Sequence, residues 1–179
     1  MEATSKLVGD REIVITRTVK SPRALVWKAC TEPAHIDQWW GPNGFANKTL
    51  SLDLRVGGQW KYTMTGADGK VWPNLITYTE VSPIDRLVYD HGDWENPKMF
   101  TGSLTFTDTD EGTLITLHTI FPTKEARDFV VEKHGAVEGG QQTLARLDKY
   151  ISTQLNPGAM IKSAASNFAV AASNGMDFA

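Results

Sequence analysis

Residues 32–45, EPAHIDQWWGPNGF, decide the fold of this chain. Two adjacent tryptophans, Trp39 and Trp40, end a short helical pattern and run directly into the turn-forming residues 41–44. Successive side chains on a helix point about 100° apart, so two neighbouring indoles cannot both face one core. We therefore expect one of them to cover a second surface, such as the mouth of a cavity.

The residues before this stretch predict a strand and then a helix. Residues 12–19 alternate, with Ile13, Ile15 and Val19 on one face and Arg17 in phase with them. Ser21 and Pro22 predict a helix start, because serine is a favoured N-cap and proline suits the first helical position. The chain thus reaches the tryptophan pair through one half-buried strand and one helix.

The residues after it predict a meander of strands and then a long helix. Five or six strands with turns between them cover residues 48–54, 59–65, 71–81, 86–91, 100–107 and 113–121, which makes about six or seven in all. Pro73 predicts an edge or a bulge, because proline removes a donor from the ladder. Residues 136–155 repeat apolar side chains every three or four positions, which predicts a helix lying on the sheet.

Composition places the chain among ordinary globular proteins. It has 179 residues, 41% of them hydrophobic and 22% charged, which suits a single domain with a real core. The net charge of −3 and the lack of a basic stripe argue against nucleic acid. The single cysteine, Cys30, excludes a disulfide framework within the chain. Because no signal peptide or membrane-length apolar run is visible, we expect a cytoplasmic protein with no metal and no cofactor.

We predict an α+β protein with a helix-grip fold, in which a curved antiparallel sheet wraps a long C-terminal helix and two short helices close one end. The domain is expected to span residues 11–155, after a polar lead-in at 1–10. Residues 156–179 change to Ala, Ser and Asn, and are expected to fill space or to join two chains in a homodimer.

Four segments together resemble a known family: REIVITRTVKSPRALVWKACTEPAHIDQWWGPNGF, LDLRVGGQWKYTM, ADGKVWPNLITYTEVSPIDRLVY and LHTIFPTKEARD. They are similar to the AHSA1-type group of the SRPBCC superfamily, related to birch-pollen-allergen, START and polyketide-cyclase proteins. The resemblance covers residues 11–154. It implies the helix-grip fold and a hydrophobic cavity, but no single activity. Gly140 departs from the pattern, since similar sequences often have an aromatic residue there; this predicts a larger cavity or a looser helix start.

Seven residues are candidates for the ligand site. The aromatic candidates for cavity lining are Trp40, Trp60, Tyr62 and Tyr89. The polar candidates are Asn74, His91 and Arg17. Each polar residue also has a structural interpretation: Asn74 satisfies the backbone of a bulge, His91 is an ordinary core histidine, and Arg17 forms a structural ion pair or faces solvent.

The function expected from these features is binding of a hydrophobic small molecule, lipid-like, polyketide-like or flavonoid-like, between the sheet and the C-terminal helix. One alternative is an enzyme of polyketide-cyclase or aromatic-hydrolase type, with His91 as a weak candidate for the catalytic base. A second alternative is a co-chaperone-like domain that binds another protein.

Overall fold

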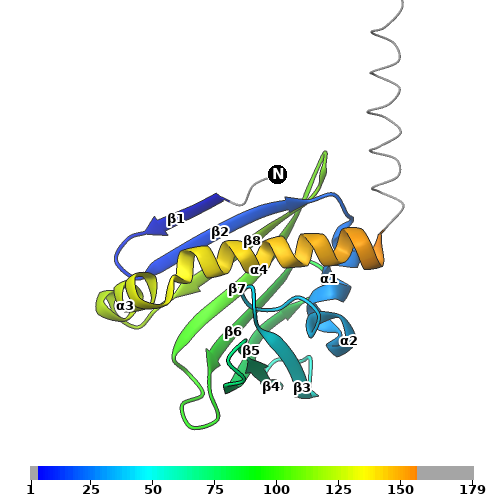
Figure 1. Ribbon diagram of the computed structural model, residues 1–179. Coiled ribbons are helices and arrows are strands. Elements are labelled where there is room, and N and C mark those ends of the chain that lie inside the picture. The colour runs from blue at the N-terminus through cyan, green and yellow to red at the C-terminus, as the bar shows by residue number, and fades with distance from the viewer. Residues whose placement is uncertain (1–3, 157–179) are drawn as a thin grey trace, which may run out of the picture.

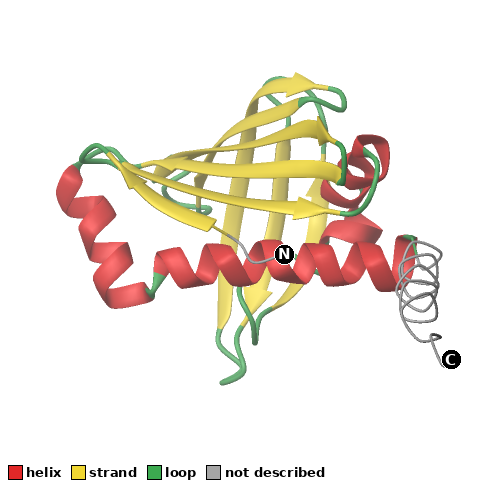
Figure 2. Cartoon of the chain, turned by 90° about the horizontal axis from the view of Figure 1, so that it is seen from above, coloured by secondary structure: helices red, strands yellow, loops and turns green. Residues whose placement is uncertain are grey.

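The computed structural model describes residues 4–156 and shows one antiparallel sheet gripping a long helix (Figures 1 and 2). The eight strands lie in the order β1-β2-β8-β7-β6-β5-β4-β3. Their bounds are β1 Thr4–Val8, β2 Glu12–Val19, β3 Ala46–Leu52, β4 Gln59–Thr65, β5 Val71–Ser82, β6 Arg86–Gly92, β7 Phe100–Thr109 and β8 Gly112–Ile120. The predicted α+β helix-grip fold is confirmed; of the tail predicted at 156–179 as a filler or dimer contact, residues 157–179 lie outside the described residues.

The helices occupy the concave side and one end of the sheet. Figure 1 shows α1 and α2 together at one end and α4 running across the sheet. Their bounds are α1 Arg23–Thr31, α2 Pro33–Ile36, α3 Lys124–His134 and α4 Ala136–Tyr150, with a π-helical turn over Ile151–Leu155 that continues α4. None of the helices in residues 4–156 is long and apolar enough to span a membrane.

The apolar stripe predicted for the long helix lies against the sheet. Leu144, Leu147 and Ile151 are at most 2% exposed and belong to one core with Ile15 and Ile115 of the sheet. At about 25 cal/mol per Å² of apolar surface removed from water, each of these side chains contributes roughly 1.5–3 kcal/mol. The stripe therefore fixes which face of α4 points into the molecule, and with it which residues reach the interior.

The first strand was not expected. Residues 1–10 read as a polar lead-in, but Thr4–Val8 pairs antiparallel with β2, placing Ser5 opposite Ile15. The strand is almost entirely exposed, so its sequence carries no alternation that marks a buried face. Without it, β2 would present a row of unpaired backbone groups at the edge of the sheet. The sheet thus has eight strands instead of six or seven.

Two local expectations have different outcomes. Pro73 lies opposite Thr63 of β4, while the pairing of β5 with β6 reaches only Leu75, so Pro73 has a neighbouring strand on one side alone, as an edge position requires. The helix start is one residue later than predicted: Pro22 is the N-cap of α1, and the buried Ser21 hydroxyl has no partner among the described residues. Ser21 instead accepts a hydrogen bond at its carbonyl from Thr113.

Candidate functional site

A cavity of about 190 Å³ lies between the inner face of the sheet, α4 and the loop that follows the tryptophan pair. Its lining residues are Trp40, Gly41, Pro42, Met64, Tyr89, His91, Phe100, Leu117, Thr119 and Thr143. None of them is charged, and the only polar side chains apart from the tyrosine and tryptophan are those of His91, Thr119 and Thr143. A mainly apolar hollow with a few polar groups is what small-molecule sites share.

Strand alternation positions the walls of this cavity. Tyr89 and His91 project inward from β6, and Leu117 and Thr119 from β8, at the two-residue spacing of a pleated strand. Gly102 of β7 lies directly opposite Tyr89, and a Cβ there would come within 2.5 Å of the Tyr89 ring. The missing side chain on β7 therefore lets the tyrosine ring lie flat beside the cavity.

The two adjacent tryptophans, Trp39 and Trp40, pack against two different parts of the molecule. Trp40 lines the cavity, and its Nε1 donates a hydrogen bond of 2.9 Å to the Tyr62 hydroxyl. Trp39 is 0% exposed, and its Nε1 donates to the carbonyl of Ala29 in α1 at 2.9 Å. The two rings meet edge to face with centroids 5.5 Å apart. Trp39 is thus the support that holds Trp40 in the wall.

A chain of hydrogen bonds continues from Trp40 behind the cavity wall. His91 Nε2 lies 3.2 Å from the Tyr62 hydroxyl and 3.0 Å from Oδ1 of Asn74. The amide nitrogen of Asn74 donates to the carbonyl of Trp72 at 3.1 Å, which fixes the amide with its oxygen toward His91. Because that oxygen can only accept, we expect the proton of the neutral ring on Nε2 and a lone pair on Nδ1.

Burial keeps this group of side chains uncharged. Removal from water lowers the pKa of His91 to about 4, because the charged imidazolium loses its hydration. The same desolvation raises the pKa values of the neighbouring Tyr62 and Tyr89 phenols well above their usual range. At neutral pH the polar end of the cavity is therefore neutral.

The lowered pKa of His91 predicts a pH dependence of stability. Between about pH 4 and 6.5 the unfolded chain binds a proton at His91 that the folded chain does not, so stability rises with pH there and levels off above about 6.5. His91 keeps some accessible surface against the cavity, which weakens the effect. We therefore expect the free energy of unfolding to rise by roughly 2 kcal/mol over this pH range, less than the whole change in pKa would give. Urea unfolding of the wild type and His91→Leu from about pH 5 to 8 checks this; equal pH slopes for the two proteins would contradict it.

The structure gathers six of the seven predicted site residues around the cavity. Trp40, Tyr89 and His91 line it. Tyr62 and Asn74 lie behind His91 as its hydrogen-bond partners, and Trp60 stacks on Tyr62 with centroids 3.9 Å apart. A role of these six in binding a ligand stays a prediction.

Arg17 lies outside the cavity wall. It shares a face with Ile13 and Ile15, as predicted, but its Nε donates to the Asp148 carboxylate of α4 at 2.8 Å. The ion pair forms because α4 crosses β2 at this point and offers a carboxylate to a half-buried guanidinium. The structural alternative stated for Arg17 is therefore what the structure shows, and we assign it no ligand.

Several lining residues escaped the sequence analysis. Leu117 and Thr119 lie two residues apart on one face of a strand that the sequence predicts, and this spacing was the available signal for both. Thr143 and Pro42 reach the cavity only because α4 and the loop cross its mouth, which no local pattern shows.

Gly140 lies against β2, where a Cβ would come within 2.1 Å of Ile15 Cδ1. Ile15 thus occupies the space next to this glycine, and an added side chain would collide with it.

The loop of residues 40–45 is held from outside by one arginine. Arg146 of α4 donates to the carbonyls of Trp40, Gly41, Pro42 and Phe45 at 2.8–3.2 Å. Burial away from a carboxylate lowers the pKa of Arg146. Gly41 has φ 86°, a backbone conformation that favours glycine, and a Cβ there would have to displace the terminal methyl of Met64. The loop therefore has a fixed path along the cavity.

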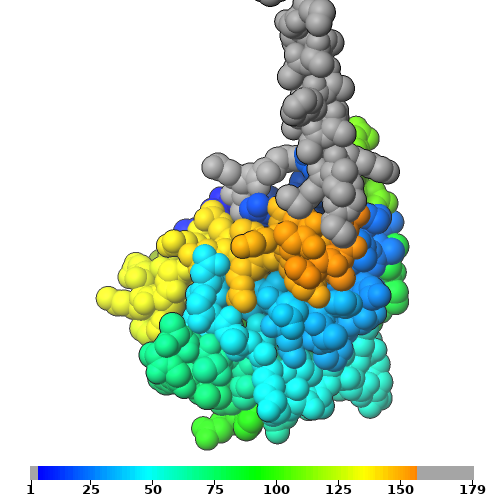
Figure 3. All heavy atoms as spheres, turned by 45° about the vertical axis from the view of Figure 1, so that its right-hand side comes forward, coloured from blue at the N-terminus to red at the C-terminus, as the bar shows by residue number. Residues whose placement is uncertain are grey.

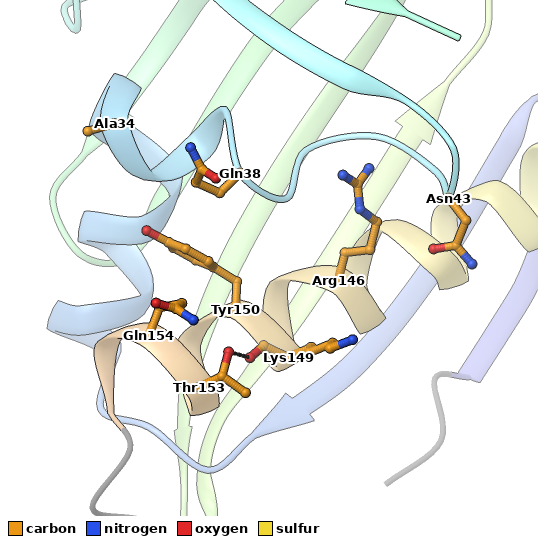
Figure 4. A pocket seen from close by; sticks show the side chains of 8 residues that line it. All are labelled: Ala34, Gln38, Asn43, Arg146, Lys149, Tyr150, Thr153 and Gln154. Carbon is orange, nitrogen blue, oxygen red and sulfur yellow. Dashed lines mark hydrogen bonds between the residues drawn. The ribbon is translucent and has the colours of Figure 1, made fainter. Parts of the chain in front are cut away.

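The same loop separates the cavity from an open groove of about 800 Å³ on the outer side of α4 (Figure 4). The groove is lined by Ala34, Gln38, Asn43, Arg146, Lys149, Tyr150, Thr153 and Gln154. Figure 3 shows this face, with the orange end of α4 beside the blue and cyan residues of α1, α2 and the loop. The groove is mainly polar, in contrast to the cavity behind it.

Metal binding and thiol chemistry have little support in the described residues. In residues 4–156, no group of three or more His, Cys, Asp or Glu side chains is placed to hold a metal ion. Cys30 is buried in α1, and desolvation raises the pKa of its thiol well above the usual range. The thiol is therefore held in its unreactive protonated form.

The family model described as "Activator of Hsp90 ATPase homolog 1-like protein" matches residues 20–152. This chain belongs to that family. Its members share a fold that commonly binds hydrophobic ligands. No curated protein matches the chain.

Solved structures show the same fold over most of this chain. Protein Ms6760 from Mycobacterium smegmatis is 27% identical, with a TM-score of 0.76 over 84% of this chain and 97% of its own. A protein from Arthrobacter aurescens is 21% identical, with a TM-score of 0.77 over 86% and 93%. Protein NE0264 from Nitrosomonas europaea is 24% identical, with a TM-score of 0.74 over 83% and 98%.

Proposed function

We propose that this protein binds a small, neutral and mostly apolar molecule in the cavity between the sheet and α4. The observation that carries the proposal is a hollow of about 190 Å³ whose lining has no charged side chain. An apolar cavity of about 150 Å³ is enough to hold benzene. The volume therefore suits a single ring or a short branched chain.

This volume narrows the ligand class expected from the sequence. A flavonoid, a long fatty acid or an extended polyketide has more than one ring or a longer chain, and would need the loop or α4 to move outward. A ring of side-chain size buries roughly 150–250 Å², which at about 25 cal/mol per Å² gives roughly 4–6 kcal/mol. We therefore expect dissociation constants of about 0.05–1 mM for unelaborated rings.

The enzymatic alternative has less support. A cyclase or hydrolase in this cavity needs a group that takes or gives a proton near neutral pH. His91 is the residue placed to do so, with Asn74 orienting its ring, but a pKa of about 4 makes it a weak base. The neutral cavity suits binding better than acid–base turnover.

Binding to another protein, a cytoplasmic location and a homodimer also stay proposals. The co-chaperone-like alternative is suggested by the activator for which the family is named, and stimulation of a chaperone ATPase by this chain would favour it. We also keep the cytoplasmic location and the possible homodimer as proposals. A single species of monomer mass in sedimentation of the full chain would remove the dimer.

Filling the cavity tests the proposed function directly. Thr119→Phe adds a ring on the inward face of β8, and we expect it to weaken toluene binding at least about tenfold, because the ring takes the ligand's space. Thr116→Phe makes the same change on the opposite face of the same strand, and we expect it to leave binding unchanged. Calorimetric titration with toluene measures both.

Magnetic resonance of the wild type provides the independent readout. Bound toluene is expected to show close contacts to Leu117 and Met64 protons, both of which lie in the lining. Failure of toluene and of similar small rings to bind the wild type at millimolar concentration would overturn the proposed function. Equal loss of binding in both phenylalanine variants would place the site elsewhere.

A further inference from the structure

The polar end of the cavity offers an unused hydrogen-bond acceptor. Nε2 of His91 is committed to Asn74 and lies beside the Tyr62 hydroxyl. Among the described residues, Nδ1 of His91 has no hydrogen-bond partner. The buried polar atoms without a partner are those of Ser21, Arg23 and Asn47, so Nδ1 retains some accessible surface. The hollow that His91 lines is the cavity. Because His91 lines this cavity, we expect the lone pair of Nδ1 to be available to a molecule inside it.

The other polar groups of the lining favour the same kind of partner. The hydroxyl of Thr143 donates to the carbonyl of Gly139 at 2.8 Å, which leaves only its lone pairs for a ligand. Thr119 supplies a hydroxyl that accepts as readily as it donates. Within residues 4–156, no lysine, arginine or carboxylate lines the cavity, so an ionised ligand would lose its hydration without a compensating charge.

We propose, on the basis of the proposed function, that the cavity selects neutral single-ring compounds bearing a hydroxyl, and that the hydroxyl donates to Nδ1 of His91. Three side chains prepare this acceptor. Asn74 holds the proton on Nε2, and the rings of Tyr89 and Phe100 enclose the imidazole, with centroids 6.3 and 4.8 Å away. His91 is thus the residue that determines specificity, and Asn74 is a positioning residue.

Phenol and toluene make the sharpest pair of probes, because they have the same number of heavy atoms and differ in the hydroxyl. The quantity measured is the ratio of their dissociation constants by calorimetry. We expect His91→Leu to shift this ratio against phenol by about three- to tenfold, the worth of one hydrogen bond. His118→Leu is the matched control, since His118 lies on the outer face of β8 and pairs with Glu12. It is expected to leave the ratio unchanged.

Nitrogen-15 spectroscopy of the His91 ring in the wild-type protein gives a readout that does not depend on a variant. We expect a protonated Nε2 and a bare Nδ1, and a shift of the Nδ1 resonance with phenol but not with toluene. A protonated Nδ1, or a phenol-to-toluene ratio that His91→Leu leaves unchanged while toluene still binds, overturns this inference and leaves the proposed function standing. If neither compound binds, the proposed function itself fails.

Discussion

Replacing Trp39 with alanine is expected to lower the free energy of unfolding by about 4 kcal/mol, as is typical of deleting a large buried aromatic side chain. Trp39 is 0% exposed and fills the space between α1 and Trp40, and its loss also removes the donor to the Ala29 carbonyl. For a chain of this length we expect the melting temperature to fall by roughly 8–16 °C. Urea unfolding and thermal unfolding measure the two quantities.

Trp72→Ala is the matched control for this change. Trp72 is 46% exposed and contacts the Lys70 ammonium over its ring at 3.7 Å. Loss of an exposed contact of this kind costs about 0.5–1 kcal/mol. If Trp39→Ala proved no more destabilising than Trp72→Ala, the role given to Trp39 as the support behind the cavity wall would be wrong.

Replacing Arg146 with methionine is expected to have the second-largest effect, a loss of about 3 kcal/mol in the free energy of unfolding. Methionine keeps an apolar stem but removes the guanidinium that donates to four carbonyls of the loop. Without Arg146, the carbonyl of Trp40 still accepts from the Asn47 amide and that of Pro42 from the Phe45 backbone. The carbonyls of Gly41 and Phe45 must turn to water, and the loop should move away from α4. Because Trp40 belongs to the loop, quenching of tryptophan fluorescence by acrylamide is expected to increase.

Two further arginine variants sharpen this test. Arg146→Lys keeps the charge but replaces a planar fork by a single ammonium, so we expect it to recover only part of the stability. Arg55→Met removes an arginine whose side chain is 73% exposed and forms an ion pair with the exposed Asp53, and it should change stability by less than about 0.5 kcal/mol. Equal stability of Arg146→Met and Arg55→Met would show that the loop holds its path without the arginine.

Periodic patterns predicted the fold well because each reports a buried face. The alternation in residues 12–19 and 113–121 and the stripe of Leu144 and Leu147 each mark one side of an element, and burial of those sides leaves few arrangements. The strand β1 was missed for the complementary reason. It is an exposed edge strand, held by backbone pairing to β2, and backbone pairing leaves no trace in side-chain pattern.

The candidate site was partly predictable for the same reason. His91, Tyr89 and Tyr62 were found because strand alternation and residue type coincide there. Pro42, Thr143 and Arg146 belong to the site only because the loop and α4 meet in the folded protein. These two segments lie about a hundred residues apart in the chain, and no local sequence pattern shows that they are in contact. The ion pair of Arg17 with Asp148 belongs to the same group of long-range contacts.

Gly102 affects the size of the cavity from the strand beside it. The ring of Tyr89 rests where a side chain at position 102 would be, with its hydroxyl oxygen 2.7 Å from the place of the absent Cβ. Any larger residue there must push the ring inward and shrink the hollow, although position 102 is itself outside the lining. The size of the hollow therefore depends on the absence of a side chain in a neighbouring strand, at a position that does not itself line the cavity.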